Sequence, residues 1–228
     1  MHKIFLYLFL LFIPANFSSM SRPVPRTSAT SSCRQLYMEM ELEGIVNYAA
    51  FEQAIAGYNK IEQKSKEILT LVDFSKPSTE ERFYVFDMRH KKLLFTSLVS
   101  HGKNSGGNYA TSFSNENGSL KSSLGFFVTE NTYQGKNGYS LVLNGLEKGI
   151  NDRAKERAIV IHGAAYSNPS VIASSGRLGR SFGCPALPQS VSKPIINTIK
   201  GGSLLFIYAN NQNYLAYSPI LSKQIATM

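Results

Sequence analysis

Short apolar runs separated by turn residues dominate the chain from residue 68 onward and restrict its fold to a β-rich class. Each run is rich in β-branched or aromatic residues and too short for a buried helix. Turns such as KPSTEE and RHKK, and segments rich in Gly and Asn, separate the runs. The succession predicts a mostly antiparallel β-sandwich or barrel. The candidate strands cover residues 68–74, 82–88, 92–100, 124–129, 139–145, 158–163, 202–208 and 213–218.

One amphipathic helix is predicted before these strands. Between Ile45 and Ile61 apolar residues recur every three or four positions, which is the period of a helix with one apolar face. Gly57 lies inside this stretch and weakens its helix propensity. We therefore expect an α+β fold that is mainly β, with a helical segment at 36–67 and one domain at 68–228 that contains no internal repeat.

The N-terminus has the pattern of a secretory signal peptide. Residues 1–20 contain a lysine near the start, an apolar run from Ile4 to Ile13, then Pro14 and small residues. Crossing a bilayer needs about 20 apolar residues, so no permanent membrane anchor is expected. Residues 21–35 are rich in Ser, Thr and Pro and are predicted to be a linker that carries Cys33. The protein is thus predicted to be exported to the periplasm or cell envelope.

The charge distribution argues against nucleic acid as a partner. The chain of 228 residues has a formal net charge of +9, but it contains no run of five or more like charges and no aromatic-basic RNA-binding signature. No acidic residue follows Glu156. Arg177, Arg180, Lys193 and Lys200 are therefore uncompensated locally, and a pocket among them would favour a substrate with free carboxylates. A solvated basic surface is the alternative for the two lysines.

Two cysteines and four histidines supply the chemistry-bearing residues. Cys33 and Cys184 are too few for a disulfide-rich fold or for a structural zinc site with three or four thiolates, although one disulfide between them is an alternative. His162 ends the apolar strand AIVIHG, where Gly163 permits close approach of backbone or ligand. The other histidines lie in the predicted signal peptide, in a turn and at the start of the Gly-rich loop HGKNSGG, namely His2, His90 and His101.

Cys184 has the surroundings that a nucleophile on a sharp turn requires. In RLGRSFGCPAL, Gly179 and Gly183 permit a close-packed turn, and Pro185 pushes Cys184 toward an extended conformation. Pro185 has no N–H, so donors for an acyl oxyanion would be the backbone N–H groups of Phe182, Gly183 and Cys184. A buried cysteine without chemistry is the alternative explanation.

His162 is the candidate partner for this thiol. A thiolate is the reactive form of cysteine, and either a protonated His162 or an electropositive pocket formed by Arg177 and Arg180 would lower the thiol pKa. Because no acid follows His162 in the chain, its imidazole must be oriented by a backbone carbonyl, by an Asn or Ser, or by an upstream acid such as Asp152. A core histidine is again the alternative.

Taken together, IVIHGAAY and GRLGRSFGCPAL resemble the catalytic signature of the bacterial murein L,D-transpeptidases. That family places a His-Gly pair at a strand end and a Ser-X-Gly-Cys element further along the chain. The resemblance covers about residues 68–210 and includes VSHGKNSGGNYATSF, GKNGYSLVLNG and GSLLFIY. It implies an L,D-transpeptidase-like fold in which Cys184 is the nucleophile and His162 is the general base, held by a neighbouring carbonyl.

The resemblance also implies a reaction. Such enzymes attack the L-to-D amide of a peptidoglycan stem tetrapeptide, release D-alanine and pass the acyl group to another stem or to water. They use no metal or cofactor, and carbapenems acylate their cysteine. We therefore expect a cysteine acyltransferase, either an L,D-transpeptidase or an L,D-carboxypeptidase, that works through a Cys184 thioester. The candidate substrate-binding residues are Arg177, Arg180, Ser181, His101 and Gly163.

One position departs from the family pattern. Phe182 stands where a histidine usually precedes the Gly-Cys pair, and His101 could compensate from its own loop. Two other functions stay open at this point. The first is a catalytically silent peptidoglycan-binding module, and the second is an exported β-domain with a structural Cys33–Cys184 disulfide.

Overall fold

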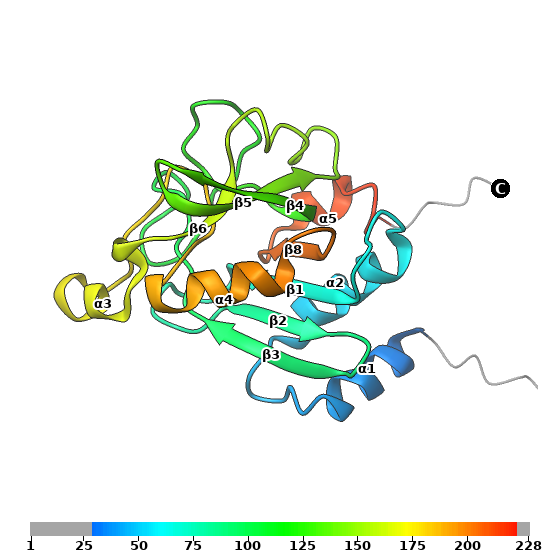
Figure 1. Cartoon of the computed structure of the whole chain (residues 1–228). Helices are drawn as coiled ribbons and strands as arrows, with labels where there is room; N and C mark the ends of the chain where they lie inside the picture. The colour runs from blue at the N-terminus through cyan, green and yellow to red at the C-terminus, as the bar shows by residue number, and fades with distance from the viewer. Residues whose placement is uncertain (1–28, 223–228) are drawn as a thin grey trace, which may run out of the picture.

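The computed structural model describes residues 29–222 (Figure 1). The predicted signal peptide and the first part of the predicted linker lie outside the described residues. The strands are β1 (Ile68–Asp73), β2 (Phe83–Asp87), β3 (Lys92–Ser97), β4 (Gly125–Gly135), β5 (Gly138–Gly145), β6 (Val160–Gly163), β7 (Ala186–Leu187) and β8 (Leu204–Tyr208). The helices are α1 (Ala29–Glu39), α2 (Tyr48–Lys60), the short 3₁₀ helix η1 (Ala165–Ser167), α3 (Pro169–Ser175), α4 (Gln189–Ile199) and α5 (Gln212–Tyr217).

The eight strands form one mixed sheet in the order β3-β2-β1-β8-β4-β5-β6-β7. The β1–β8 and β6–β7 pairs are parallel, and the other neighbours are antiparallel. A bridge between Ser100 and Ala186 joins the segment after β3 to β7 at the opposite edge, so the sheet nearly closes on itself. The predicted mainly β, α+β fold is confirmed, with all strands in one curved sheet.

Helices α2 and α4 pack directly against this sheet. α4 packs against β1, β5 and β6 through buried Ile195, Ile196 and Ile199, and it crosses in front of the sheet in Figure 1. α2 packs against β1 and β8 and begins where the Asn47 side chain accepts a hydrogen bond from the N–H of Ala49. A Cβ on Gly57 would lie 2.0 Å from Phe126 Cζ, which explains the glycine inside α2.

The N-terminal prediction is wrong in one respect. α1 begins at Ala29, so residues 29–35 are helical and do not form a linker. Cys33 is only 6% exposed and lies in the same core as Tyr37, Phe51 and the strands. Its apolar contacts with α2 outweigh the weak helix propensity of the Ser/Thr-rich sequence. Both Cys33 and Cys184 are free thiols, which overturns the alternative of a structural disulfide.

The last predicted strand is also wrong. Residues 212–217 form helix α5, whose N-cap Asn211 accepts a hydrogen bond from the N–H of Tyr214 at 2.9 Å. The Tyr214 hydroxyl donates to the buried carboxylate of Glu147 at 3.0 Å, and Ser218 donates to the same group. These tertiary hydrogen bonds anchor the helix. The sequence analysis also did not predict α1, α3, α4 or β7.

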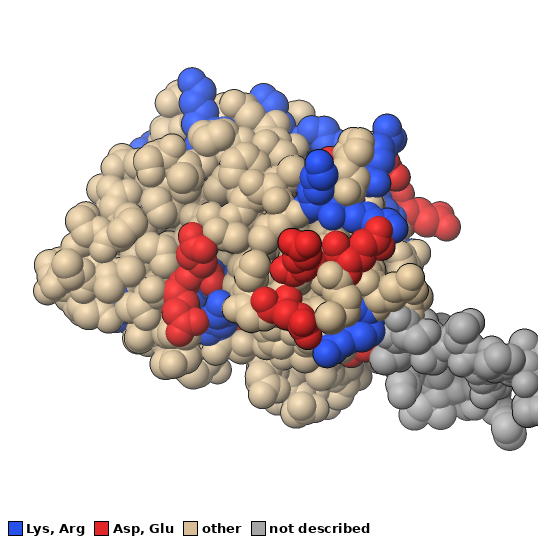
Figure 2. Space-filling view, turned by 90° about the horizontal axis from the view of Figure 1, so that it is seen from below, with Lys and Arg blue, Asp and Glu red and all other residues tan. Residues whose placement is uncertain are grey.

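The acidic residues are unevenly distributed along the chain. Most acidic residues lie between Glu39 and Asp87, and Figure 2 shows acidic side chains gathered on the face seen from below. Ion pairs such as Glu39–Lys91 neutralise some of them. The segment 157–222 is acid-free and supplies part of the candidate site. Among residues 29–222, no helix has the length and apolar character needed to cross a membrane.

Candidate active site

A cavity of about 160 Å³ contains the two residues that the sequence singles out for chemistry. His162 lines it from β6, and Cys184 lines it from the turn before β7. The fold therefore brings the HG and SFGC motifs to one place. The other residues around this cavity are Asn137, Tyr166, Arg180, Ser181 and Phe182.

A larger cavity, of about 490 Å³, lies beside α5. Aromatic and amide side chains such as Phe113, Asn115 and Tyr217 line it, and it contains no cysteine or histidine. Its lining offers no nucleophile with a neighbouring base, so the smaller cavity is the candidate active site.

Strand pairing fixes the position of His162. This residue pairs with Ser140 of β5 and Ala186 of β7 at the end of β6. A Cβ on the following Gly163 would lie 2.4 Å from Ser192 Oγ of α4, so glycine is required for α4 to pack here. Gly163, a candidate substrate-binding residue, lies against α4 and outside the cavity lining.

A backbone carbonyl orients the imidazole. His162 Nδ1 lies 3.2 Å from the Gly163 carbonyl oxygen, and the tautomer that donates this hydrogen bond leaves Nε2 unprotonated. Asp152 accepts hydrogen bonds from Asn115 Nδ2 and from the Gly149 N–H, so it is engaged elsewhere. His162 is 4% exposed, and burial lowers the pKa of its ring below the ordinary value. The ring is therefore neutral near pH 7.

The turn that presents Cys184 is held from inside by Ser181. Its hydroxyl donates to the Cys184 carbonyl at 2.6 Å and accepts from the Gly183 N–H at 3.1 Å. Gly183 has φ +127°, and a Cβ there would lie 2.8 Å from the Lys121 carbonyl oxygen, so only glycine fits. Ser181 is buried and shapes the turn in addition to lining the cavity.

The same hydrogen bonds narrow the set of oxyanion donors. The N–H of Gly183 is already bound to Ser181 Oγ. Within residues 29–222, the backbone N–H groups of Phe182 and Cys184 donate no hydrogen bond to any other residue. Two of the three predicted backbone donors are therefore free of other protein partners.

The Cys184 thiol is enclosed by the segment that leads into β6. Its Sγ accepts a hydrogen bond from the Val160 N–H at 3.5 Å and donates to the Ala158 carbonyl at 3.7 Å. Cys184 is 8% exposed, and burial raises the pKa of its thiol, with Val160 and the Arg157 charge opposing this effect. Since the pKa of His162 is lowered and that of Cys184 is raised, the resting pair is a neutral imidazole and a neutral thiol.

The cations near this thiol differ from those expected. Arg180 lines the cavity, but its Nη1 is bound to the carbonyl oxygens of Lys103 and Gly106. Arg177 Nη1 donates to the Leu178 carbonyl oxygen, and Arg177 does not line the cavity. Arg157, which the sequence analysis missed, is the cation that lowers the Cys184 pKa. Its place directly before the His162 strand was the one available signal.

The rim of the cavity carries the residue that departs from the family pattern. Phe182 is 69% exposed, and Lys103 Nζ lies 4.9 Å from the centre of its ring. No group of three or more His, Cys, Asp or Glu residues that could hold a metal ion is found within residues 29–222.

Comparison with known proteins identifies the family of this chain. The family described as "L,D-transpeptidase catalytic domain" matches residues 42–208. The chain belongs to this L,D-transpeptidase family. The match begins ahead of α2 and includes that helix. No curated protein sequence matches the chain.

Several solved structures resemble this chain at low sequence identity. An L,D-transpeptidase from Mycobacterium smegmatis is 15% identical, with 63% of this chain and 59% of that chain covered and a TM-score of 0.40. The helical cell shape determining protein Pgp2 from Campylobacter jejuni is 13% identical, with 70% and 56% covered and a TM-score of 0.42. An L,D-transpeptidase from Stackebrandtia nassauensis is 14% identical, with 79% and 78% covered and a TM-score of 0.38.

In this L,D-transpeptidase family member, His101 lies outside the candidate active site. Its ring is 1% exposed, accepts a hydrogen bond from Arg82 Nη2 at 2.9 Å through Nδ1, and packs edge-on against Phe74. Only its backbone reaches the turn that carries Cys184, where the His101 carbonyl oxygen accepts a hydrogen bond from the Ser181 N–H. The side chain is thus not placed to compensate for Phe182.

The buried His101 predicts a loss of stability in mild acid. Burial and the Arg82 charge lower its pKa from 6.5 to about 4. As the pH falls below 6.5 the unfolded chain binds a proton at His101 and the folded chain does not. Stability present above pH 6.5 is therefore lost toward pH 4, and roughly 2 kcal/mol is lost between pH 7 and pH 5.

Urea unfolding at pH 7 and pH 5 measures this effect. His162 contributes in the same direction, so the comparison is between wild type and His101→Gln, which keeps an acceptor for Arg82. Between pH 7 and pH 5 the free energy of unfolding of the variant should fall by roughly 2 kcal/mol less than that of the wild type. An equal pH dependence in both proteins would contradict the assignment.

Proposed function

We propose that this family member is a cysteine acyltransferase that acts on peptidoglycan stem peptides through a thioester on Cys184. The observation that carries the proposal is the meeting of Cys184 and His162 in one cavity, beside backbone N–H groups without other protein partners. Nucleophile, base and oxyanion donors are the components that acyl transfer requires.

The chemistry follows from these positions. His162 Nε2 takes the thiol proton as Cys184 Sγ attacks the carbonyl carbon of the L-to-D amide. The N–H groups of Phe182 and Cys184 stabilise the oxyanion. The C–N bond then breaks, the imidazolium protonates the leaving amine, and D-alanine departs from a thioester. An amine of a second stem or a water molecule attacks the thioester, gives its proton to His162 and restores the thiol.

The resting protonation states define the role of His162. A neutral thiol beside a neutral imidazole means that the proton moves during the attack, so His162 acts as a general base. A preformed thiolate–imidazolium pair would need the opposite pKa shifts. The reaction should therefore need a substrate that brings sulfur, carbonyl and imidazole into line.

Positive charge at the rim favours the acidic stem peptide. Arg180 lines the cavity and Lys103 lies over Phe182 at its edge, and no acid follows Glu156 in the chain. The carboxylates of a stem tetrapeptide suit these cations. We expect the enzyme to meet such a substrate in the periplasm or cell envelope, to which the predicted signal peptide would export it. Carbapenems should acylate the same thiol.

Intact-mass analysis of the purified protein tests the proposal. Incubation with a tetrapeptide donor should add the acyl tripeptide and release D-alanine, and a carbapenem should add its whole mass because its lactam ring opens on the thiol. Release of D-alanine without cross-linked product would identify a carboxypeptidase. A protein that binds peptidoglycan yet gains no mass with either reagent would be a silent binding module, and the proposal would be wrong.

A further inference from the structure

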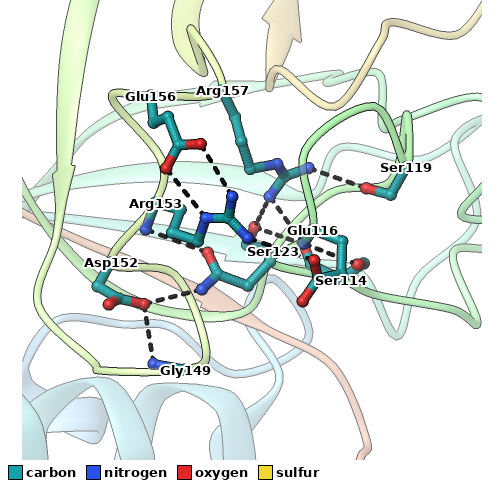
Figure 3. Close-up of polar contacts among 10 residues, drawn as sticks. Ser114, Glu116, Ser119, Ser123, Gly149, Asp152, Arg153, Glu156 and Arg157 are labelled. Atoms are coloured by element: carbon teal, nitrogen blue, oxygen red, sulfur yellow. Dashed lines mark hydrogen bonds and ion pairs between the residues drawn. The ribbon is translucent and has the colours of Figure 1, made fainter.

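Arg157 is a half-buried arginine whose contacts are all with neutral groups. Its guanidinium donates to the carbonyl oxygens of Ser114 (2.7 Å) and Lys121 (2.6 Å) and to the hydroxyls of Ser123 (2.5 Å) and Ser119 (3.3 Å). Figure 3 shows the guanidinium of Arg157 pointing into the loop that runs from Ser114 to Ser123. None of these partners carries a charge, so the positive charge of Arg157 is not neutralised by its hydrogen bonds.

In contrast to Arg157, the neighbouring Arg153 binds charged partners. It forms ion pairs with Glu156 at 2.9 Å and with Glu116 at 3.3 Å. Figure 3 shows the Glu156 carboxylate turned toward Arg153, although Glu156 directly precedes Arg157 in the chain. Glu116 and Glu156 are therefore ion-paired with Arg153, and neither forms an ion pair with Arg157.

The guanidinium of Arg157 lies against the Gly183–Cys184 turn. Arg157 Nη2 lies 3.5 Å from the place where a Cβ on Gly183 would stand, so the guanidinium is directly behind the residue that precedes Cys184. The Lys121 carbonyl, which binds Arg157, faces the same point at 2.8 Å. Ser122 Oγ donates to the Gly183 carbonyl at 3.1 Å and fixes the loop to the turn. The glycine is required by the Lys121 carbonyl oxygen and by Ile159 Cδ1, which a Cβ would approach to 2.9 Å, whereas the guanidinium lies at an ordinary contact distance.

The residues that follow Arg157 contact the sulfur itself. The Ala158 carbonyl accepts from the Cys184 thiol, and the Val160 N–H donates to the same Sγ. Loss of the thiol proton removes the hydrogen bond to Ala158 and leaves a carbonyl dipole facing a negative sulfur. The Val160 N–H and the Arg157 charge then remain to offset that repulsion.

We propose that Arg157 is a positioning residue that stabilises the thiolate form of Cys184 from behind the Gly183–Cys184 turn. The importance of this role for catalysis rests on the proposed function, because only a nucleophilic Cys184 makes use of it. The other titratable or charged residues that line the cavity with Cys184 are His162, whose ring is neutral, Tyr166 and Arg180, whose guanidinium is bound to two backbone carbonyls. Arg157 differs from them in approaching through the protein interior.

Alkylation of Cys184 by iodoacetamide as a function of pH tests the proposal without any substrate. The thiolate forms the new C–S bond as iodide leaves, so the midpoint of the rate–pH curve reports the thiol pKa. Peptide mass spectrometry follows Cys184 separately from Cys33. Arg157→Gln, which keeps two N–H donors but no charge, should raise the Cys184 midpoint by about one pH unit and slow alkylation near pH 7.5 about tenfold.

Two matched variants separate charge from structure. Arg153→Gln removes a neighbouring arginine and should leave the midpoint unchanged, whereas Arg157→Lys keeps the charge and should move the midpoint by much less than Arg157→Gln. An unchanged midpoint in folded Arg157→Gln, or an equal shift in Arg153→Gln, would overturn the proposal. If Arg157→Gln does not fold, Arg157→Lys decides, because a full-unit shift with the charge retained would assign Arg157 to holding the loop alone. Failure of either kind leaves the acylation assay of the proposed function unaffected.

Discussion

Replacing Cys184 with alanine is expected to abolish both D-alanine release from a tetrapeptide donor and the mass increase with a carbapenem. Alanine has no sulfur to form the thioester, and the remaining groups can only activate water. The rate of D-alanine release should fall by roughly 10⁴-fold or more. The alanine fits the buried site, so loss of folding is not the cause. Intact-mass analysis measures acylation, a D-alanine assay measures release, and circular dichroism measures whether the variant is folded.

Cys33→Ala is the matched control for this variant. Both thiols are free and buried, but Cys33 lies in α1 within the core and outside the candidate active site. Cys33→Ala should keep acylation and D-alanine release at the wild-type level and lower the thermal midpoint, because it removes apolar contacts between α1 and α2. Persistent acylation of Cys184→Ala at another residue would refute the assigned nucleophile.

Local patterning was enough to predict most of the sheet. The runs that became β1, β2, β5 and β8 combine β-branched or aromatic residues with clear turn signals at both ends, so local preference and tertiary burial agree. The two wrong predictions arise where these conflict. NYLAYS is a short run of apolar and aromatic residues, as in a strand, but the Asn211 cap and the buried Glu147 partner of Tyr214 make it helical. The Ser/Thr-rich start of α1 has weak helix propensity, and packing of Cys33 and Tyr37 on α2 stabilises it.

For the candidate site as well, local sequence features could be predicted and features that depend on long-range contacts could not. The HG and SFGC motifs could be joined from sequence because each carries a residue type with its own chemistry and the glycines that its turn needs. Arg157 and the true position of His101 could not be predicted, because both depend on long-range contacts. Hydrogen bonds to the loop 114–123 hold Arg157 in place. The His101 ring is held by Arg82, which directly precedes β2. Charged side chains do not reveal by periodicity which partner the fold will bring to them.

Replacing His162 with glutamine is expected to slow carbapenem acylation of Cys184 by about 10²- to 10⁴-fold at neutral pH. Glutamine cannot accept the thiol proton, and burial has raised the pKa of that thiol, so the variant depends on the rare thiolate. In the wild type the rate should fall only as the pH drops through the lowered pKa of His162, because the protonated ring can no longer act as a base. The variant should lack this acid limb, and its residual rate should rise continuously toward high pH. Acylation rates from pH 5 to pH 10 measure both features, with His90→Gln, in the exposed turn after β2, as a control that keeps the wild-type curve. A His162→Gln profile that matches the wild type in rate and shape would remove His162 from the mechanism and leave the thiolate to form by solvent deprotonation.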